Sequence, residues 1–73
     1  MTLMWEVRAA PGRLEELVAF VCDAADPSAQ VYRSGGPDPR VVLIDPSERG
    51  IAAVPDELVA RPAHAWRFEL VER

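Results

Sequence analysis

Residues 3–25 read LMWEVRAAPGRLEELVAFVCDAA, and the spacing of their apolar side chains changes near residue 11. Before that point Leu3, Trp5 and Val7 occupy alternate positions, the two-residue period of a strand with one buried face. After it the apolar residues follow the spacing of one helical stripe: Leu14, Leu17, Val18, Val21, Cys22 and Ala25. The sequence therefore predicts a strand over residues 3–9, a tight Pro-Gly turn and an amphipathic helix that ends near residue 25.

Four more segments complete the predicted order. They are an edge strand over 29–34, a strand over 40–45, one or two helical turns over 55–60 and a strand over 64–70. The unbroken apolar run at 41–44 indicates a strand that is covered on both faces and is central in the sheet. Residues 51–54 are predicted as a short extended piece with no assigned partner. The order strand, helix, strand, strand, short helix, strand is that of a ferredoxin-like α+β fold with an antiparallel sheet.

In that fold the first and last strands are antiparallel neighbours, so their side chains share two faces. On the helix side we expect the large apolar side chains of both strands: Trp5, Val7, Trp66, Phe68 and Leu70. On the opposite face we expect cross-strand ion pairs, each worth only about 0.2–1 kcal/mol, among Glu6, Arg8, Arg67 and Glu69.

The size of the chain predicts a partner. Its 73 residues make one domain, spanning 1–73, and a domain this small buries only about 60% of the surface of its unfolded chain. A single Cys excludes an internal disulfide, and one Cys with one His argues against a structural zinc. One long helix covers one face of a four-stranded sheet, and the other face carries Met4 and Val41 or Val42. We therefore expect a homodimer.

Composition excludes several classes of protein. The net charge is −4 and every basic residue is Arg, which argues against binding to nucleic acid. No stretch reaches the roughly 20 apolar residues of a membrane span, and the first residues lack the features of a secretory signal. These features favour a cytoplasmic protein. The dominance of Ala, Arg, Pro and Val is typical of a bacterial genome rich in G and C.

Four stretches, residues 4–9, 11–13, 40–44 and 61–68, together resemble short bacterial members of the antibiotic biosynthesis monooxygenase-like domains. These domains belong to the dimeric α+β barrel superfamily. The resemblance implies a homodimer whose two sheets face each other, with small pockets between sheet and helices. Some members of that family oxidise aromatic polyketides without metal or flavin, and others degrade haem, so the resemblance also points to these two activities.

The sequence departs from that family in its catalytic features. The interval of the second helix is interrupted by Pro46, Gly50, Pro55 and Pro62. Characterised catalytic members depend on an Asn, and this chain has none. The haem-degrading branch takes its axial His from the second helix, whereas His64 directly precedes the last strand. Only the fold and the dimer are therefore carried over, with no catalytic residue, no metal and no cofactor.

Four residues are candidates for a functional site. His64 is the candidate for proton transfer, because only its side chain has an ordinary pKa near neutrality; the alternative is a histidine that hydrogen-bonds a loop at the start of the strand. Trp66 and Trp5 either stack on a planar ligand or belong to the core. Tyr32 either donates its hydroxyl near a pocket or is simply half-exposed.

The remaining polar candidates have structural interpretations. Cys22 lies near the end of the helix and is expected to be a buried, inert thiol. Asp45 is expected to accept backbone N–H groups in the turn that follows it, and Asp38 and Asp56, each beside a proline, are interpreted in the same way.

Three functions remain open. The first is a dimeric barrel that binds a small apolar or aromatic molecule, either as its own role or as an accessory protein. The second is a cofactor-independent monooxygenase or isomerase that uses His64 with Trp66 or Tyr32. The third is a partner-binding module that offers the 29–34 edge for strand addition.

Overall fold

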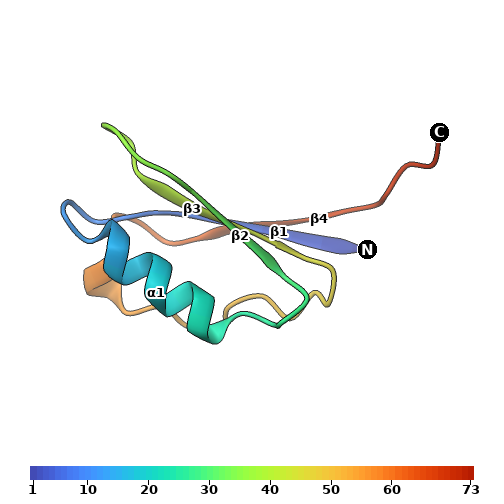
Figure 1. Ribbon diagram of the computed structural model, residues 1–73, viewed down its shortest axis with the longest axis horizontal. Helices are drawn as coiled ribbons and strands as arrows, with labels where there is room; N and C mark the ends of the chain where they lie inside the picture. The colour runs from blue at the N-terminus through green and yellow to red at the C-terminus, as the bar shows by residue number, and fades with distance from the viewer.

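The computed structural model describes all 73 residues and contains four strands, one α-helix and one 3₁₀ turn. In chain order these are β1 (Thr2–Arg8), α1 (Leu14–Ala24), β2 (Gln30–Ser34), β3 (Arg40–Asp45), η1 (Asp56–Leu58) and β4 (His64–Phe68). The strands form one antiparallel sheet in the order β2-β3-β1-β4. Both α1 and η1 lie on the same side of this sheet, and the C-terminal residues project away from it (Figure 1). This small α+β architecture is compatible with a ferredoxin-like fold, as the sequence predicts.

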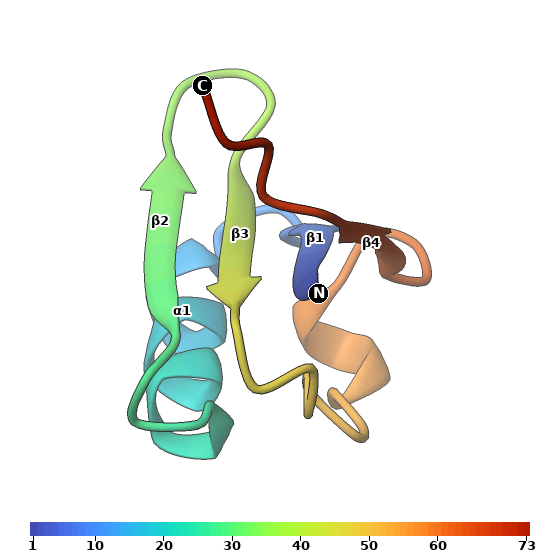
Figure 2. The same cartoon turned by 90° about the vertical axis from the view of Figure 1, so that its right-hand side faces the viewer.

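The predicted second helix is reduced to η1, a single turn of three residues. Pro55 precedes this turn and Pro62 follows it, and a proline removes the backbone donor that a longer helix needs. Residues 51–54, predicted as extended, form no strand. Figure 2 shows the result: α1 lies behind β2 and β3, while the loop segment that contains η1 lies beneath β1 and β4.

The core lies between the sheet and these two covering segments. Burial alternates along β1 and β3, so that Trp5 and Val7 face α1 together with Val41 and Leu43. The helix contributes Leu17 and Val21, both fully buried, and η1 contributes Leu58. The two-residue and helical periods of the sequence therefore predict these contacts correctly.

The predicted face of β4 is wrong. Trp66 pairs with Met4, and Ala65 pairs with Trp5. Directly paired residues of an antiparallel sheet share a face, so Trp66 and Phe68 lie opposite to α1, and Leu70 lies beyond the strand. Every residue of β4 is exposed, so no packing against the helix side selects the face of its aromatic side chains, and the pairing with β1 decides it.

The predicted charge pairs differ for the same reason. Arg67 lies on the helix side opposite Leu3 and donates a 2.7 Å hydrogen bond to Glu48, and Glu69 lies outside β4. Glu6 and Arg8 keep their predicted face, where their charged partners come from the β2–β3 connection and β3: Glu6 binds Arg40 and Arg8 binds Asp38.

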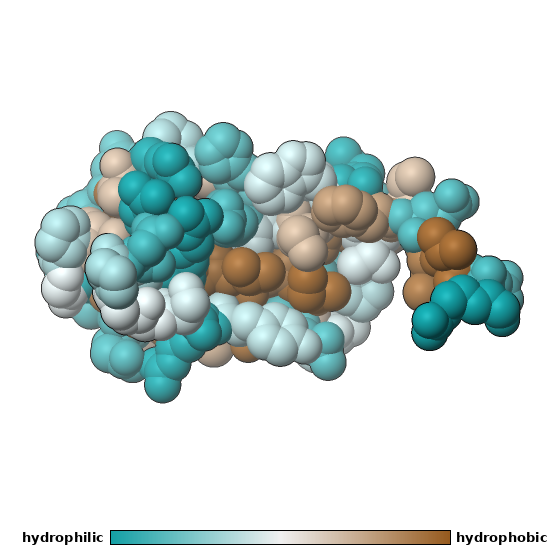
Figure 3. Space-filling view, turned by 90° about the horizontal axis from the view of Figure 1, so that it is seen from above, coloured by the Kyte–Doolittle hydropathy of each residue, from teal (hydrophilic) through white to brown (hydrophobic).

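The face opposite to α1 has no cover from any segment of the chain. We call it the open face, and its apolar and aromatic side chains are Met4, Tyr32, Val42, Ile44, Trp66 and Phe68. Figure 3 looks onto this face, with apolar side chains gathered near its middle. The prediction that β3 is central is confirmed, but cover on both faces is not: Val41 and Leu43 are buried while Val42 and Ile44 are only half-buried.

The turn after β3 is held by the buried carboxylate of Asp45, as the sequence predicts. Asp45 is fully buried; it accepts hydrogen bonds from the Ser47 amide at 2.9 Å, the Ser47 hydroxyl at 2.6 Å and the Gly50 amide at 2.7 Å. Gly50 has a φ of 64°, and a Cβ there would lie 2.9 Å from Leu3 Cδ2. Both the conformation and the close approach require glycine.

Replacing Asp45 with Ala is expected to lower the free energy of unfolding by about 2–4 kcal/mol, because the buried Gly50 amide and the partly buried Ser47 amide lose their acceptor. Urea denaturation measures the change. Asp23→Ala, at an exposed helical position, is the matched control and should stay within about 0.5 kcal/mol of the wild type. Equal stability of the two variants would contradict the role given to Asp45.

The ionisation of the Asp45 carboxylate makes the stability of the fold depend on pH. Burial raises the pKa of Asp45, but the hydrogen bonds from Ser47 and Gly50 outweigh it and hold that pKa below its usual value. The carboxylate's contribution to stability is thus fully present above the unfolded pKa of about 3.9 and is lost as the pH falls through the folded-state pKa. We expect the stability difference between the wild type and Asp45→Asn to be constant near neutrality and to shrink below about pH 4. A difference that does not change with pH in urea denaturation would refute this.

Candidate functional site

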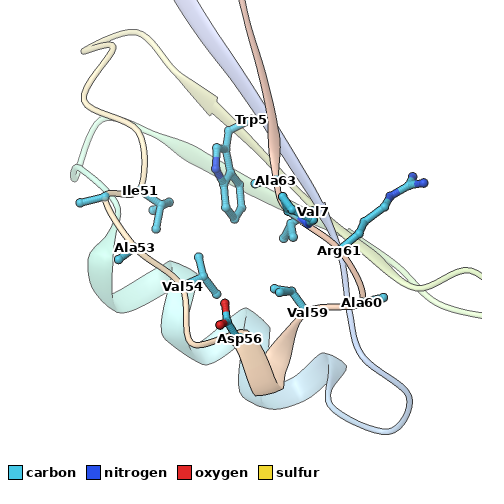
Figure 4. A pocket seen from close by; sticks show the side chains of 12 residues that line it. Trp5, Val7, Ile51, Ala53, Val54, Asp56, Val59, Ala60, Arg61 and Ala63 are labelled. Carbon is cyan, nitrogen blue, oxygen red and sulfur yellow. The ribbon is translucent and has the colours of Figure 1, made fainter.

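A half-open apolar pocket lies between β1 and the segment that precedes β4. We call it the Trp5 pocket; its volume is about 370 Å³. Its wall on the sheet side is formed by Trp5 and Val7, and the rest comes from residues 51–63 (Figure 4). The apolar residues of this second wall are Ile51, Ala52, Ala53, Val54, Val59, Ala60, Pro62 and Ala63.

We call the wall formed by residues 51–63 the outer wall. Backbone hydrogen bonds hold it in place at its η1 end. Ala10 donates to the Leu58 carbonyl and Ala60 donates to the Arg8 carbonyl, each at 2.9 Å. Val59 forms an isolated bridge with Ala9. The segment is thus fastened to the end of β1, while residues 51–54 line the pocket together with Trp5. A short turn in place of a second helix leaves the space beside Trp5 unfilled.

The chemistry of the pocket is mainly that of an apolar surface. Trp5 is only 5% exposed and supplies the largest flat side chain. The only charged residues at the pocket are Asp56 and Arg61, and in Figure 4 the Arg61 guanidinium extends away from it. The pocket contains no His, Cys, Ser or Tyr, and its lining is suited to hold an apolar molecule.

The structure separates the residues that the sequence singles out. Trp5 lines the pocket, whereas Tyr32, His64 and Trp66 lie on the open face. The His64 and Trp66 rings are stacked, with centroids 5.8 Å apart and an angle of 10° between their planes. The Tyr32 hydroxyl donates to Gln30 Oε1 at 3.2 Å, and 54% of Tyr32 is exposed. No bond joins Tyr32 to the His64–Trp66 pair.

Cys22 is exposed, so the expected burial of its thiol is wrong. The buried stripe of α1 is centred on Leu17 and Val21. Successive helical residues differ by about 100° around the axis, which turns the side chain after Val21 toward solvent.

A network of charges lies at one end of the open face. Arg40 donates to Glu6 at 2.7 Å and to Asp38 at 2.6 Å, and Arg8 Nε lies 2.6 Å from Asp38 Oδ1 without forming a hydrogen bond. The hydrogen bond from Arg40 holds the pKa of Asp38 below its usual value. The sequence predicts that Asp38 accepts backbone N–H groups in its turn, but its carboxylate instead binds Arg40 and Arg8. Asp56, given the same expectation, is the first residue of η1 and borders the Trp5 pocket.

The sequence does not single out the residues of the outer wall. Ile51, Val54 and Val59 are apolar but are spaced irregularly between prolines, so no period marks them as one surface. The only available signal is an apolar stretch in an interval that the prolines prevent from forming a long helix.

Other site types are not assembled in this structure. No three side chains among His, Cys, Asp and Glu come together in a group that could hold a metal ion. No helix has the length and apolar character needed to cross a membrane.

Comparisons with protein-family models, with curated proteins and with solved structures find no match to this chain.

Proposed function

We propose that this protein binds a small apolar or aromatic molecule in the Trp5 pocket and does not transform it chemically. The observation that carries this proposal is the half-open pocket of about 370 Å³ with a nearly buried tryptophan as its wall. Small-molecule sites are concave and mostly apolar, with a few polar groups, and their volumes are typically about 300–1,000 Å³. The Trp5 pocket has these properties.

A role as a cofactor-independent monooxygenase or isomerase has less support. His64, Trp66 and Tyr32, the residues proposed for it, lie on the open face and not around the Trp5 pocket. A general base must lie within hydrogen-bond reach of the proton that it removes, and none of the three borders the space that would hold a ligand.

We also propose that two copies of the chain associate through their open faces, which would give the dimeric α+β barrel that the sequence resembles. Trp66 and Phe68 are 46% and 49% exposed there, and Val42 and Ile44 lie beside them in the sheet, half-buried. An apolar face in so small a domain is the surface that a second copy would bury. The Trp5 pocket lies on the other side of the sheet and stays accessible in such a dimer.

For the ligand, naphthalene is expected to bind saturably and to shift the methyl signals of Val54 and Val59 in NMR spectra. Ala63→Phe should weaken this binding at least tenfold, because the added ring fills the pocket from an exposed position of its wall. Ala19→Phe places the same ring on the exposed surface of α1 and should bind like the wild type. Absence of saturable binding, or equal weakening in both variants, would count against the proposal.

For the dimer, light scattering coupled to size exclusion is expected to give twice the chain mass of 8.1 kDa at micromolar concentration. Trp66→Asp should shift the protein to a monomer, because a charge would be buried in the interface. Ala19→Asp introduces the same charge on the helix and should remain dimeric. A monomeric wild type, or a dimeric Trp66→Asp variant with native circular dichroism, would rule out this interface.

A further inference from the structure

The indole N–H of Trp5 is a donor without a partner in the chain. No side-chain hydrogen bond of the protein involves Trp5. Arg8 Nε is the only fully enclosed side-chain nitrogen or oxygen that lacks a hydrogen bond, so Trp5 Nε1 is not fully enclosed. The atom is therefore unpaired and still within reach from outside the protein. Buried tryptophans usually find an acceptor for this group, so a free one on a pocket wall is informative.

The position of the indole directs this donor into the Trp5 pocket. In Figure 4 the ring projects from β1 toward the outer wall, with its nitrogen on the edge that faces residues 51–54. The side chains there, Ile51, Ala53 and Val54, offer methyl groups and no acceptor. A molecule that enters the pocket meets this hydrogen-bond donor on the Trp5 wall, in a mainly apolar surface whose charged residues are Asp56 and Arg61.

The charged residues at the pocket indicate which net charge a ligand can carry. Asp56 places a carboxylate on the η1 side of the pocket, and the Arg61 guanidinium extends away. An anionic ligand would approach the Asp56 carboxylate without a facing cation, which disfavours it. A neutral acceptor, such as a carbonyl or ether oxygen, satisfies the indole N–H at no such cost.

We infer that the Trp5 pocket selects neutral apolar molecules that carry a hydrogen-bond acceptor, and that Trp5 Nε1 is the group that recognises it. This inference rests on the proposed function, because it needs the pocket to bind ligands, and it adds the chemical feature that separates a preferred ligand from a hydrocarbon of the same shape. The preference has a physical reason: a buried donor left unpaired beside a hydrocarbon loses its contact with water without compensation.

A matched pair of probes tests the inference. 2-Acetylnaphthalene and 2-isopropenylnaphthalene have nearly the same shape, but only the first carries an acceptor oxygen. The chain has two tryptophans, so ¹⁵N-labelled protein gives two indole N–H signals, which Trp66→Phe assigns. The acetyl compound is expected to bind at least tenfold more tightly and to move the Trp5 indole proton downfield, with the Trp66 signal unchanged.

The outcomes separate this inference from the proposed function. If both probes shift the methyl signals of Val54 and Val59 with equal affinity, the pocket binds ligands but Trp5 does not select them, and the inference is wrong. If only the Trp66 indole moves, the probes bind the open face, and the proposed pocket is wrong as well. If neither binds, both proposals fail.

Trp5→Phe provides the variant test. It keeps an aromatic wall and removes the donor, so a folded Trp5→Phe protein should bind the two probes equally. A retained tenfold preference in that variant would overturn the inference. Because the probe pair is compared on the wild-type protein, the test holds even where the variant does not fold.

Discussion

The alternation of side chains along β1 is the constraint on which the rest of the structure depends. β1 pairs with β3 on one side and β4 on the other, so its register decides for three strands which residues face α1. The odd positions carry Leu3, Trp5 and Val7 into the core, and the even positions carry Met4 and Glu6 to the open face. A shift of one residue would exchange the two sets. The buried apolar set fixes the register, because the exchange would expose Trp5 and bury Glu6.

The segment between β3 and β4 forms the pocket on the helix side of the sheet. A second long helix would pack against β1 and fill the space beside Trp5. Instead the chain reverses at the turn held by Asp45 and Gly50, crosses beneath Trp5, and is fastened at Leu58 and Ala60. The turn and the fastened end fix the two limits of the outer wall, and between them Ile51 and Val54 pack against the core only in part, which leaves the pocket beside Trp5. The pocket is thus a consequence of a short connection and of the prolines that keep it from becoming helical.

The two faces of the sheet differ in how far their side chains are exposed to water. On the helix side, α1 and η1 bury nearly all the large apolar side chains. On the open face, the charged group of Glu6, Arg8, Asp38 and Arg40 forms its own network, and the aromatic side chains beside it remain half-exposed. The ion pairs are partly exposed, and such pairs stabilise a fold only slightly; their effect is to leave the apolar part of the face as a separate patch. The proposed dimer uses this patch, and the proposed ligand uses the opposite side of the sheet.

The sequence by itself determined the elements of this protein and much of its core. The period of two in residues 3–9 and the helical period after Pro11 are local properties, and each places its buried residues, such as Trp5 and Leu17, from neighbours in the chain. The turn at Asp45 follows equally from local hydrogen-bonding chemistry. Only the tertiary structure decided the face of Trp66, the exposure of Cys22, the arginine partners of Asp38 and the existence of the Trp5 pocket. Each of these depends on which distant segment lies alongside, and the alternation of β4 fits either face equally well until its pairing with β1 fixes the register.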